Sequence, residues 1–460
     1  MQGRRVIVWF RQDLRLHDNE ALTEALSHAE EVIPVYVFDP RVLRGQTLFG
    51  FPKTGAARIR FLIEAVAELR TAIRALGSEL VVRVGRPEDE IFDIADQAKT
   101  SWVFCNRERT GEEVAVQDAL EHKLWSIGQE VRFSRGKMLY YTADLPFPVT
   151  HTPDHFTTFR KETERIVKVR APLDPPERLS PFTADLEPGR LPDLEDLIDG
   201  HPTPIHPIGA GGEKAGLARL ARIGEPGLTP DERCISPWLS HGCLSPKMVY
   251  AFLSHADIPG ERLGRVLTGL LYRDYLRLMA KKHGAAIFSA GGTTGEVVHS
   301  EETPSAVFWR WAQGTTGLPI IDAAMQQLVQ TGFMPCKVRQ LCAHFLIYEL
   351  GVPWRLGASY FESHLVDYDP CSNWVNWANI AGVGPDSRDE RKINYVLQAK
   401  RLDAEGTYVK RWIPALRNAD HQWIHQPDQA GAAQLRASEI TLGQDYPNPV
   451  LSSDRWHALS

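Results

Sequence analysis

Apolar runs alternate with longer, helix-like segments along the first 133 residues of the chain. The runs are VIVWF (6–10), VIPVYVF (32–38), LVVRVG (80–85) and WVFCN (102–106). Residues 57–77 separate the second run from the third, and their apolar positions recur with helical spacing up to a closing glycine. Continuous apolar strands separated by helices are typical of a parallel sheet that is covered on both faces. The pattern therefore predicts a doubly wound α/β domain at residues 1–133.

The pattern changes after this first domain. Residues 134–207 are rich in Pro, Asp and charged residues and fit neither period, so we expect a linker laid over the surface. Residues 208–418 have helical spacing with Gly and Pro at the breaks, which predicts a large all-α domain. Residues 419–460 have weak periodicity and many prolines, which predicts a loosely packed C-terminal tail.

The composition narrows the class of protein. A chain of 460 residues exceeds the size at which one core keeps growing, so two or three domains are expected. It is 43% hydrophobic and 24% charged, as ordinary globular proteins are. The formal net charge of −6 argues against a chain coated in nucleic acid, although it is compatible with a local basic patch.

Targeting and metal-binding signals are not found in the sequence. The N-terminus MQGRRVIVWF runs directly into a strand-like segment, and no apolar run is long enough to span a bilayer. We therefore expect a cytoplasmic protein without membrane association. The six cysteines are scattered without a CxxC pair, which predicts reduced, mostly buried thiols and neither a disulfide framework nor a metal site.

Amides and indoles are concentrated in the stretch YDPCSNWVNWANIAGVG at residues 368–384. In a helix, Asn373 and Trp377 share one face, and Asp369 lies one turn before them. Such a stripe of carboxylate, amide and indole suits a planar ligand rich in heteroatoms. The alternative is a Trp-rich core helix with amide caps, which is the commoner outcome for aromatic residues at this spacing.

Several longer motifs follow one another along the chain. They are WFRQDLRLHDN (9–19), DLPF (144–147), HTPDHFTTFRKETE (151–164), SPWLSHGCLSP (236–246), TTGLPIIDAAMQQL (315–328), YDPCSNWVNW (368–377) and QAKRLDAEGTYVKRWIPAL (398–416). Together they resemble the photolyase/cryptochrome family, most closely its DASH branch, over about residues 5–416. The resemblance implies an α/β antenna domain, a helical domain that holds FAD in a bent form, and blue-light-driven electron transfer.

The resemblance also implies which residues surround the flavin. Asn373 matches the asparagine that faces the flavin N5, and Asp367 and Asp369 match the carboxylates of the same loop. Arg339 matches the arginine that pairs with Asp367 across the flavin, and Arg273 matches an arginine beside the cofactor phosphates. Without the resemblance, Arg339 and Asp367 would be read as a buried ion pair that holds two helices together.

Three further residues are assigned in the same way. Ser236 matches the last residue of the phosphate-binding segment. Trp377 and Trp354 match the two inner members of the tryptophan chain that passes an electron to the excited flavin, although Trp354 also suits a simple packing role.

The chain departs from the family pattern at several positions. Glu232 and Arg233 stand where the family has hydroxyl residues on the phosphates; a glutamate there would repel a pyrophosphate, and an arginine would compensate. Gly269 and Cys336 replace the glutamate and asparagine that contact the lesion in repair enzymes. The region of the outermost tryptophan, VHSEET, holds His299 and acids, which leaves Trp309 or a tyrosine as substitutes.

An antenna chromophore is also implied. The segment ERTGEEV (108–114) places Glu112 and Glu113 where the family uses an acidic residue to bind the pterin ring of a folate, methenyltetrahydrofolate. A carboxylate that accepts two hydrogen bonds from an aminopyrimidine edge suits this role, which we assign to Glu113. An acidic first turn favoured by the helix dipole explains the same residues almost as well.

Two classes of function follow. The first is a monomeric blue-light flavoprotein. It acts either as a photoreceptor whose light-induced conformational change is recognised by a signalling partner, or as a weak repair enzyme for pyrimidine dimers in DNA. The alternative is a competent deoxyribodipyrimidine photolyase, a carbon–carbon lyase, that acts on single-stranded or damaged DNA. Basic residues in YLRLMAKKHG (275–284) and in RDERK (388–392) suit a strand-binding face, or are solvated helix faces. A flavin-free scaffold that keeps only the fold is a third hypothesis.

Overall fold

Five parallel strands form the first part of the molecule, in the spatial order β3-β2-β1-β4-β5. The computed structural model describes residues 4–198, 206–256, 258–295, 303–387 and 392–459. The strands are β1 (Arg5–Phe10), β2 (Glu31–Phe38), β3 (Val81–Val84), β4 (Trp102–Asn106) and β5 (Glu130–Ser134). The strand order confirms the predicted open α/β sheet.

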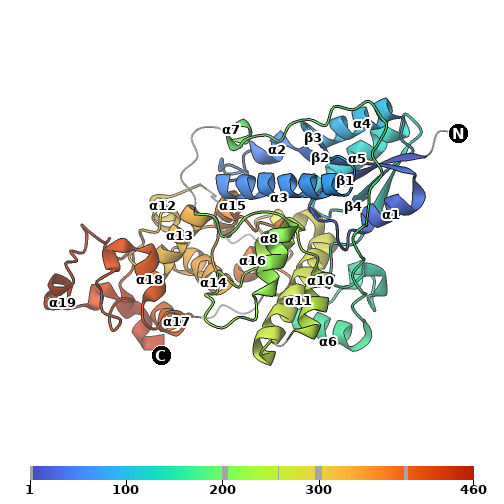
Figure 1. Ribbon diagram of the computed structural model, residues 1–460. Helices are drawn as coiled ribbons and strands as arrows, with labels where there is room; N and C mark the ends of the chain where they lie inside the picture. Colours follow the sequence, from blue (N-terminus) through green and yellow to red (C-terminus); the bar gives the residue numbers. More distant parts are fainter. Residues whose placement is uncertain (1–3, 199–205, 257, 296–302, 388–391, 460) are drawn as a thin grey trace.

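Helices cover both faces of this sheet (Figure 1). They are α1 (Glu20–His28), α2 (Pro40–Leu43), α3 (Ala56–Ala75), α4 (Pro87–Ala98) and α5 (Gly111–Trp125). Because successive strand residues point to opposite faces, β1 contributes to two separate cores. Val8 and Phe10 belong to the large cluster that includes α1 and α3, whereas Ile7 and Trp9 pack with the buried residues of α4 and α5.

The segment after the sheet contains more structure than expected of a linker. It forms α6 (Phe156–Ile166) and α7 (Leu194–Leu197), and Phe159 of α6 is fully buried against Tyr275, with ring centroids 5.6 Å apart. Farther along, the carbonyl of Pro188 accepts a hydrogen bond from the backbone N–H of Val82, an edge-strand residue, at 2.8 Å. Helix α6 was not predicted from the sequence because only a few of its residues are apolar.

The second part of the molecule is helical and lies beneath the sheet in Figure 1. Its helices are α8 (Glu213–Ala221), α9 (Ser236–Ser240), α10 (Pro246–His255), α11 (Gly260–His283), α12 (Ala306–Ala312), α13 (Pro319–Thr331), α14 (Cys336–His344), α15 (Trp354–His364), α16 (Pro370–Ile380), α17 (Tyr395–Leu402), α18 (Thr407–Trp412) and α19 (Ala432–Ala437). Short 3-10 or π turns are at Thr142–Asp144, Val149–His151, Gly284–Phe288, Phe345–Glu349, Pro414–Leu416, Pro427–Gln429 and Ser453–Leu459. The long helix α11 packs along α16. The predicted all-α part is confirmed.

The C-terminal segment is packed more tightly than its sequence pattern suggests. Trp423, Ile424 and Tyr446 are buried in a cluster with α18, and the Tyr446 hydroxyl donates a hydrogen bond to Asp322 at 2.7 Å. Trp456 is 1% exposed and belongs to the main core. These aromatic residues are too widely spaced along the chain to produce a periodic signal.

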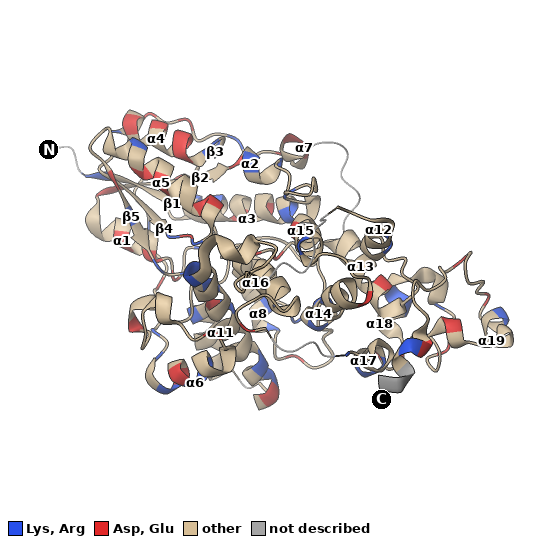
Figure 2. Ribbon diagram, turned by 180° about the vertical axis from the view of Figure 1, so that it is seen from behind, with Lys and Arg blue, Asp and Glu red and all other residues tan. Residues whose placement is uncertain are grey.

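Acidic and basic positions are spread over both parts of the molecule (Figure 2). All six cysteines carry free thiols. Within the described ranges, no helix is both long enough and apolar enough to cross a membrane, and no group of His, Cys, Asp and Glu is suited to hold a metal.

Candidate functional site

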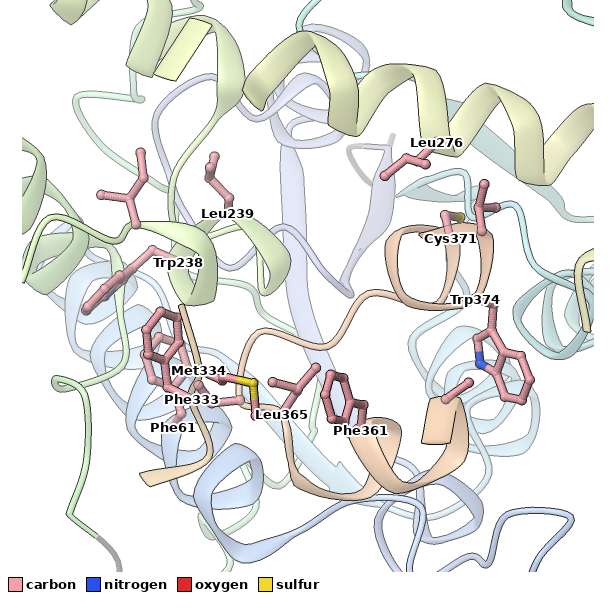
Figure 3. Close-up of a cluster of buried hydrophobic side chains, with 14 of the residues drawn as sticks. Phe61, Trp238, Leu239, Leu276, Phe333, Met334, Phe361, Leu365, Cys371 and Trp374 are labelled. Carbon is pink, nitrogen blue, oxygen red and sulfur yellow. The ribbon is translucent and has the colours of Figure 1, made fainter. Parts of the chain in front are cut away.

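A cavity of about 400 Å³ opens among α9, α11, α14, α15 and α16, and we call it the central cavity. Its wall contains nearly all the site residues that the sequence suggests: Ser236, Gly269, Arg273, Cys336, Arg339, Asp367, Asp369, Asn373 and Trp377. Apolar side chains complete the lining, and Figure 3 shows four of them, Leu276, Met334, Phe361 and Leu365. A largely apolar cavity with a few convergent polar groups is typical of a cofactor site.

Helix α16 presents the amide and the indole to this cavity because its start is fixed by a cap. Asp369 is the N-cap, and its carboxylate accepts a hydrogen bond from the backbone N–H of Ser372 at 2.8 Å. Pro370 follows at the first helical position, where a missing N–H has no cost. From this start, Asn373 and Trp377 lie one turn apart on the cavity wall.

Asp369 also forms a buried ion pair that the sequence analysis missed. Arg277 of α11 donates to its carboxylate at 2.6 Å, and the two side chains are only 4% and 6% exposed. Burial by itself raises the pKa of Asp369, but the Arg277 and Arg273 guanidiniums lower it more strongly, so the carboxyl stays ionised well below its usual range. The available signal was spacing, because Arg277 lies one helical turn after Arg273.

Arg273 is the cation best placed to meet an anionic ligand. It donates to the carbonyls of Leu239 at 2.8 Å and Lys137 at 3.2 Å. Burial, assisted by the nearby charge of Arg277, lowers its pKa to about 10, so it remains cationic at neutral pH. Within the described ranges, no carboxylate lies within ion-pairing distance of it. A cation in a cavity wall whose hydrogen-bond partners are neutral carbonyls suits a phosphate or pyrophosphate group.

Arg339, Asp367 and Ser236 form one network. Arg339 donates to both carboxylate oxygens of Asp367, at 3.0 and 2.8 Å, and to the carbonyl of Met334 at 2.6 Å. The hydroxyl of Ser236 donates to the same carboxylate. The network ties α14 and the first residue of α9 to the loop before α16.

The orientation of Asn373 determines which group it can offer to a ligand. Its Nδ2 donates to the carbonyl of Ala358 at 3.0 Å, and the side chain is nearly buried. Its Oδ1 makes no hydrogen bond to the residues described here. The remaining group is therefore an acceptor, which suits a ring N–H.

Trp377 and Trp354 occupy different aromatic surroundings. The Trp377 ring contacts Trp311 and Phe361, with centroids 6.3 and 5.1 Å away. The Trp354 ring instead contacts Trp374 at 5.8 Å, and its indole N–H donates to the carbonyl of Ala290. In the described part of the chain these two rings do not contact each other, and Trp354 does not line the central cavity.

The Trp377 ring packs directly on Gly357 of α15, where a Cβ would overlap it. Gly357→Ala should therefore displace the indole and lower the free energy of unfolding by about 1–3 kcal/mol, as overpacking usually does. Urea denaturation of the purified protein measures this change. The matched control is Gly264→Ala, at an exposed glycine of α11 with open space around it, which should gain up to about 1 kcal/mol in helix propensity. Equal stability of the two variants would contradict the tight packing.

Gly269 and Cys336 contribute neither a carboxylate nor an amide to the cavity wall. A Cβ added at Gly269 would meet nothing within 4 Å, and Cys336 is exposed at the start of α14. Glu232 does not line the cavity, because it is exposed and accepts hydrogen bonds from the backbone and hydroxyl of Thr229, each at 2.8 Å. His299 lies outside the described residues.

The acidic residues expected to bind a folate have local partners. Glu113 accepts a hydrogen bond from the Thr110 hydroxyl at 2.7 Å, as a capping box of its own helix, and Glu112 pairs with Lys53. The helix-start alternative thus describes the observed contact of Glu113, whereas Glu112 pairs with a residue outside its helix. The antenna role of Glu113 stays a prediction.

A second cavity of about 240 Å³, which we call the basic cavity, lies between the two parts of the molecule. Its wall holds six cationic side chains: Arg107, Arg109, Arg135, Lys137, Arg277 and Lys281. Glu108 is buried beside it and pairs with Lys137. The sequence analysis missed this cavity because its residues come from four separate segments.

The basic residues expected to face a DNA strand are distributed differently. In α11, Arg277 is buried, Lys281 lines the basic cavity, and Lys282 pairs with Asp154 at 2.7 Å. Most of the RDERK segment, residues 388–391, lies outside the described residues. The described part of these two segments therefore does not form one continuous basic face.

Comparison with known proteins identifies the family to which the chain belongs. Residues 6–178 match the family model described as DNA photolyase, and residues 266–458 match the FAD binding domain of DNA photolyase. The chain is 38% identical to cryptochrome DASH of Gloeobacter violaceus, covering 98% of this chain and 94% of that protein. It is 37% identical to cryptochrome DASH of Xenopus laevis, covering 99% and 91%. The solved structure of a Synechocystis cryptochrome matches with a TM-score of 0.91 at 36% identity, covering 99% of this chain and 98% of that one. The chain therefore belongs to the photolyase/cryptochrome family, is similar to its DASH members along nearly its whole length, and contains the family's FAD-binding domain.

Proposed function

We propose that this protein is a blue-light photoreceptor in which light drives an electron from Trp377 into the central cavity, and that it repairs pyrimidine dimers only weakly. FAD, when bound, supplies the absorption of blue light and the one-electron chemistry. The observation that carries the proposal is the cavity wall. An oxidisable indole and an amide acceptor lie one turn apart on it, whereas Gly269 and Cys336 offer no lesion-binding carboxylate or amide.

The residues of the cavity fit the chemical groups of FAD. Arg273 is available to a pyrophosphate, because its own partners are neutral carbonyls. The Oδ1 of Asn373 can accept a hydrogen bond from a ring N–H, and the indole of Trp377 offers a π-face beside it. Asp369 is paired with Arg277, and Asp367 is paired with Arg339. Neither carboxylate would therefore repel the phosphates of the ligand as an isolated negative charge.

Weak repair follows from the groups that line the open side of the cavity. A flipped base that enters a site without hydrogen-bond partners leaves its polar edge unpaired after desolvation. Each missing hydrogen bond costs about 1–3 kcal/mol. Gly269 and Cys336 together remove two such partners, so binding and positioning of a dimer should both suffer.

Restoring the two side chains should raise repair. Because the space beside Gly269 is open, the double substitution Gly269→Glu and Cys336→Asn should fold and increase light-dependent repair by at least about tenfold, the equivalent of about 1.4 kcal/mol. The assay uses FAD-loaded protein and single-stranded DNA that carries a thymine dimer, and blue-light reduction of the bound flavin is followed in the same samples.

The control for added charge is Gly264→Glu in the same helix, at a position that does not line the cavity. It should leave repair at the wild-type level. Flavin reduction without efficient repair in the wild type supports the photoreceptor function. Efficient repair by the wild type would favour the second candidate, a competent photolyase, for which the openness of the cavity beside Gly269 is the supporting observation. A wild type that shows neither activity would contradict both.

We assign the basic cavity to a folate antenna. A folate carries glutamyl carboxylates, and six cationic side chains surround this cavity. Glu108 is a buried carboxylate beside these cations and pairs with Lys137, and Glu113 stays the predicted contact of the pterin ring. Addition of methenyltetrahydrofolate, followed by its near-ultraviolet absorption, checks the assignment.

We also retain the division into residues 1–133, 134–207, 208–418 and 419–460, a cytoplasmic location and a monomeric state as proposals. Six free thiols suit a reducing compartment. DNA and a signalling protein both remain candidate partners, and the repair assay distinguishes between them.

A further inference from the structure

Glu232, one of the residues that depart from the family pattern, lines a third cavity and not the central one. This cavity has a volume of about 240 Å³ and is lined from α8, α13, α18 and residues 206–208, and we call it the α13 cavity. Of the residues described here, Phe333 alone lines both the α13 cavity and the central cavity. The side chains on which the argument depends are Arg219, Asp231, Glu232, Gln327, Arg411 and Trp412.

Two guanidinium groups of the α13 cavity have only uncharged partners. Arg411, at the end of α18, lies over the ring of Trp412, 4.9 Å from its centroid. Arg219 donates to the carbonyls of Glu232, at 2.8 Å, and of Ile208. Within the described ranges, no carboxylate lies within ion-pairing distance of either guanidinium. The indole N–H of Trp412, a residue that is only 7% exposed, also has no hydrogen-bond partner there. Such a wall suits a carboxylate ligand, which accepts two parallel N–H bonds from a guanidinium.

Two carboxylates of the same wall each keep one oxygen unused. The Oδ2 of Asp231 accepts a hydrogen bond from the Gln327 amide at 2.8 Å, and Gln327 is itself fixed by the Tyr408 hydroxyl at 2.6 Å. The Oε2 of Glu232 accepts from the backbone N–H and the hydroxyl of Thr229. The second oxygen of each carboxylate makes no hydrogen bond to the residues described here. Both oxygens can therefore accept from an ammonium group.

The charges of the wall select the class of ligand. With histidine counted as neutral, the two arginines balance the two carboxylates, so a purely anionic ligand would be repelled by Asp231 and Glu232, and a purely cationic one by the arginines. Burial raises the pKa of the Asp231 carboxyl and the charge of Arg411 lowers it, so these two groups are close enough for one small ligand to contact both. A ligand that carries both an anionic and a cationic group fits this wall.

We propose that the α13 cavity binds a free α-amino acid with an apolar side chain. Arg411 and Arg219 hold its carboxylate, and Asp231 and Glu232 hold its ammonium group. The apolar part of the wall receives the side chain and consists of Pro207, Ile208, Phe333 and Trp412. The inference does not depend on the proposed light-driven function.

The test measures calorimetric binding of L-leucine to the FAD-loaded protein, in which the central cavity is already filled. Two analogues each lack one charged group: 4-methylpentanoate has no ammonium, and 3-methylbutylamine has no carboxylate. L-Leucine should bind at least about tenfold more tightly than either analogue, because only it satisfies both pairs of charged side chains.

Two variants should change the selectivity in opposite directions. Asp231→Asn should weaken leucine binding by at least about tenfold and should strengthen binding of 4-methylpentanoate, since it removes a negative charge but keeps an oxygen that accepts from Gln327. Arg411→Gln should weaken the binding of leucine and of 4-methylpentanoate, but not that of 3-methylbutylamine. The control is Arg417→Gln, at an exposed arginine that follows α18 and does not line the cavity, and it should behave as wild type.

Three results would overturn the proposal. The first is a lack of leucine binding at millimolar concentration, which would leave the α13 cavity as a solvated hollow. The second is equal binding of leucine and its two analogues, and the third is leucine binding that survives both Asp231→Asn and Arg411→Gln. Each of them leaves the light-driven function untouched, because that function is tested through the central cavity.

Discussion

Asp369→Asn should lower the free energy of unfolding by about 3–5 kcal/mol, because it leaves Arg277 buried without its carboxylate partner. Asparagine caps a helix about as well as aspartate, so the change removes the charge and keeps the cap of α16. Chemical denaturation of the protein without added FAD measures the difference. The control is Asp193→Asn, at the exposed N-cap of α7, which should shift stability by less than about 0.5 kcal/mol.

The effect should depend on pH in a defined direction. The pKa of Asp369 is lowered in the folded protein, so its stabilisation is fully present above the ordinary aspartate pKa of about 3.9 and is lost as the pH falls toward the folded value. The difference between wild type and variant should therefore shrink below about pH 4. Adding Arg277→Met to Asp369→Asn should recover part of the loss, since it removes the unpaired charge. A variant as stable as wild type at neutral pH would show that Arg277 finds another partner, with Glu108 at 4.0 Å as the candidate.

Trp377→Phe should leave FAD bound but slow its photoreduction by at least about tenfold, the equivalent of about 1.4 kcal/mol in the barrier. A phenyl ring still packs against Phe361 and Trp311, so the cavity wall is kept, but the oxidisable indole is removed. The visible spectrum of the bound flavin under blue light, with a thiol present, measures the rate. The control is Trp125→Phe, at an indole on α5 that is 78% exposed and does not line the central cavity. An unchanged rate would mean that another residue on the wall, such as Tyr272 or Tyr368, donates the electron.

Much of the fold was predictable because it depends on local patterns. The parallel sheet follows from uninterrupted apolar strands, and most of the helical part follows from its spacing. Helix α6 escaped prediction because its burial rests mainly on Phe159, whose contact with Tyr275 is distant in sequence. The C-terminal core escaped for the same reason, since Trp423 and Tyr446 meet only in three dimensions.

The site residues that belong to a sequence motif were predictable, whereas residues whose role depends on a partner from another helix were less so. The cavity wall around Asn373 and Trp377 follows from one helical stretch together with the family resemblance. Arg277 was missed because nothing local to it signals that Asp369 lies opposite. Trp354 was assigned to the electron chain by analogy; its ring contacts Trp374, and its role in electron transfer stays a prediction. Packing partners of this kind are a property of the assembled helices.

The hydrogen bond between Pro188 and Val82 has a consequence for the behaviour of the protein at high concentration. An exposed edge strand is a template on which other chains can add and aggregate, and strand β3 is one of the two edges of the sheet. The segment around Pro188 shields part of that edge, and Gly189 allows the close approach, since a Cβ there would overlap the Val82 carbonyl. A proteolytic cut in this segment would therefore act through precipitation of the chain, with the central cavity still intact.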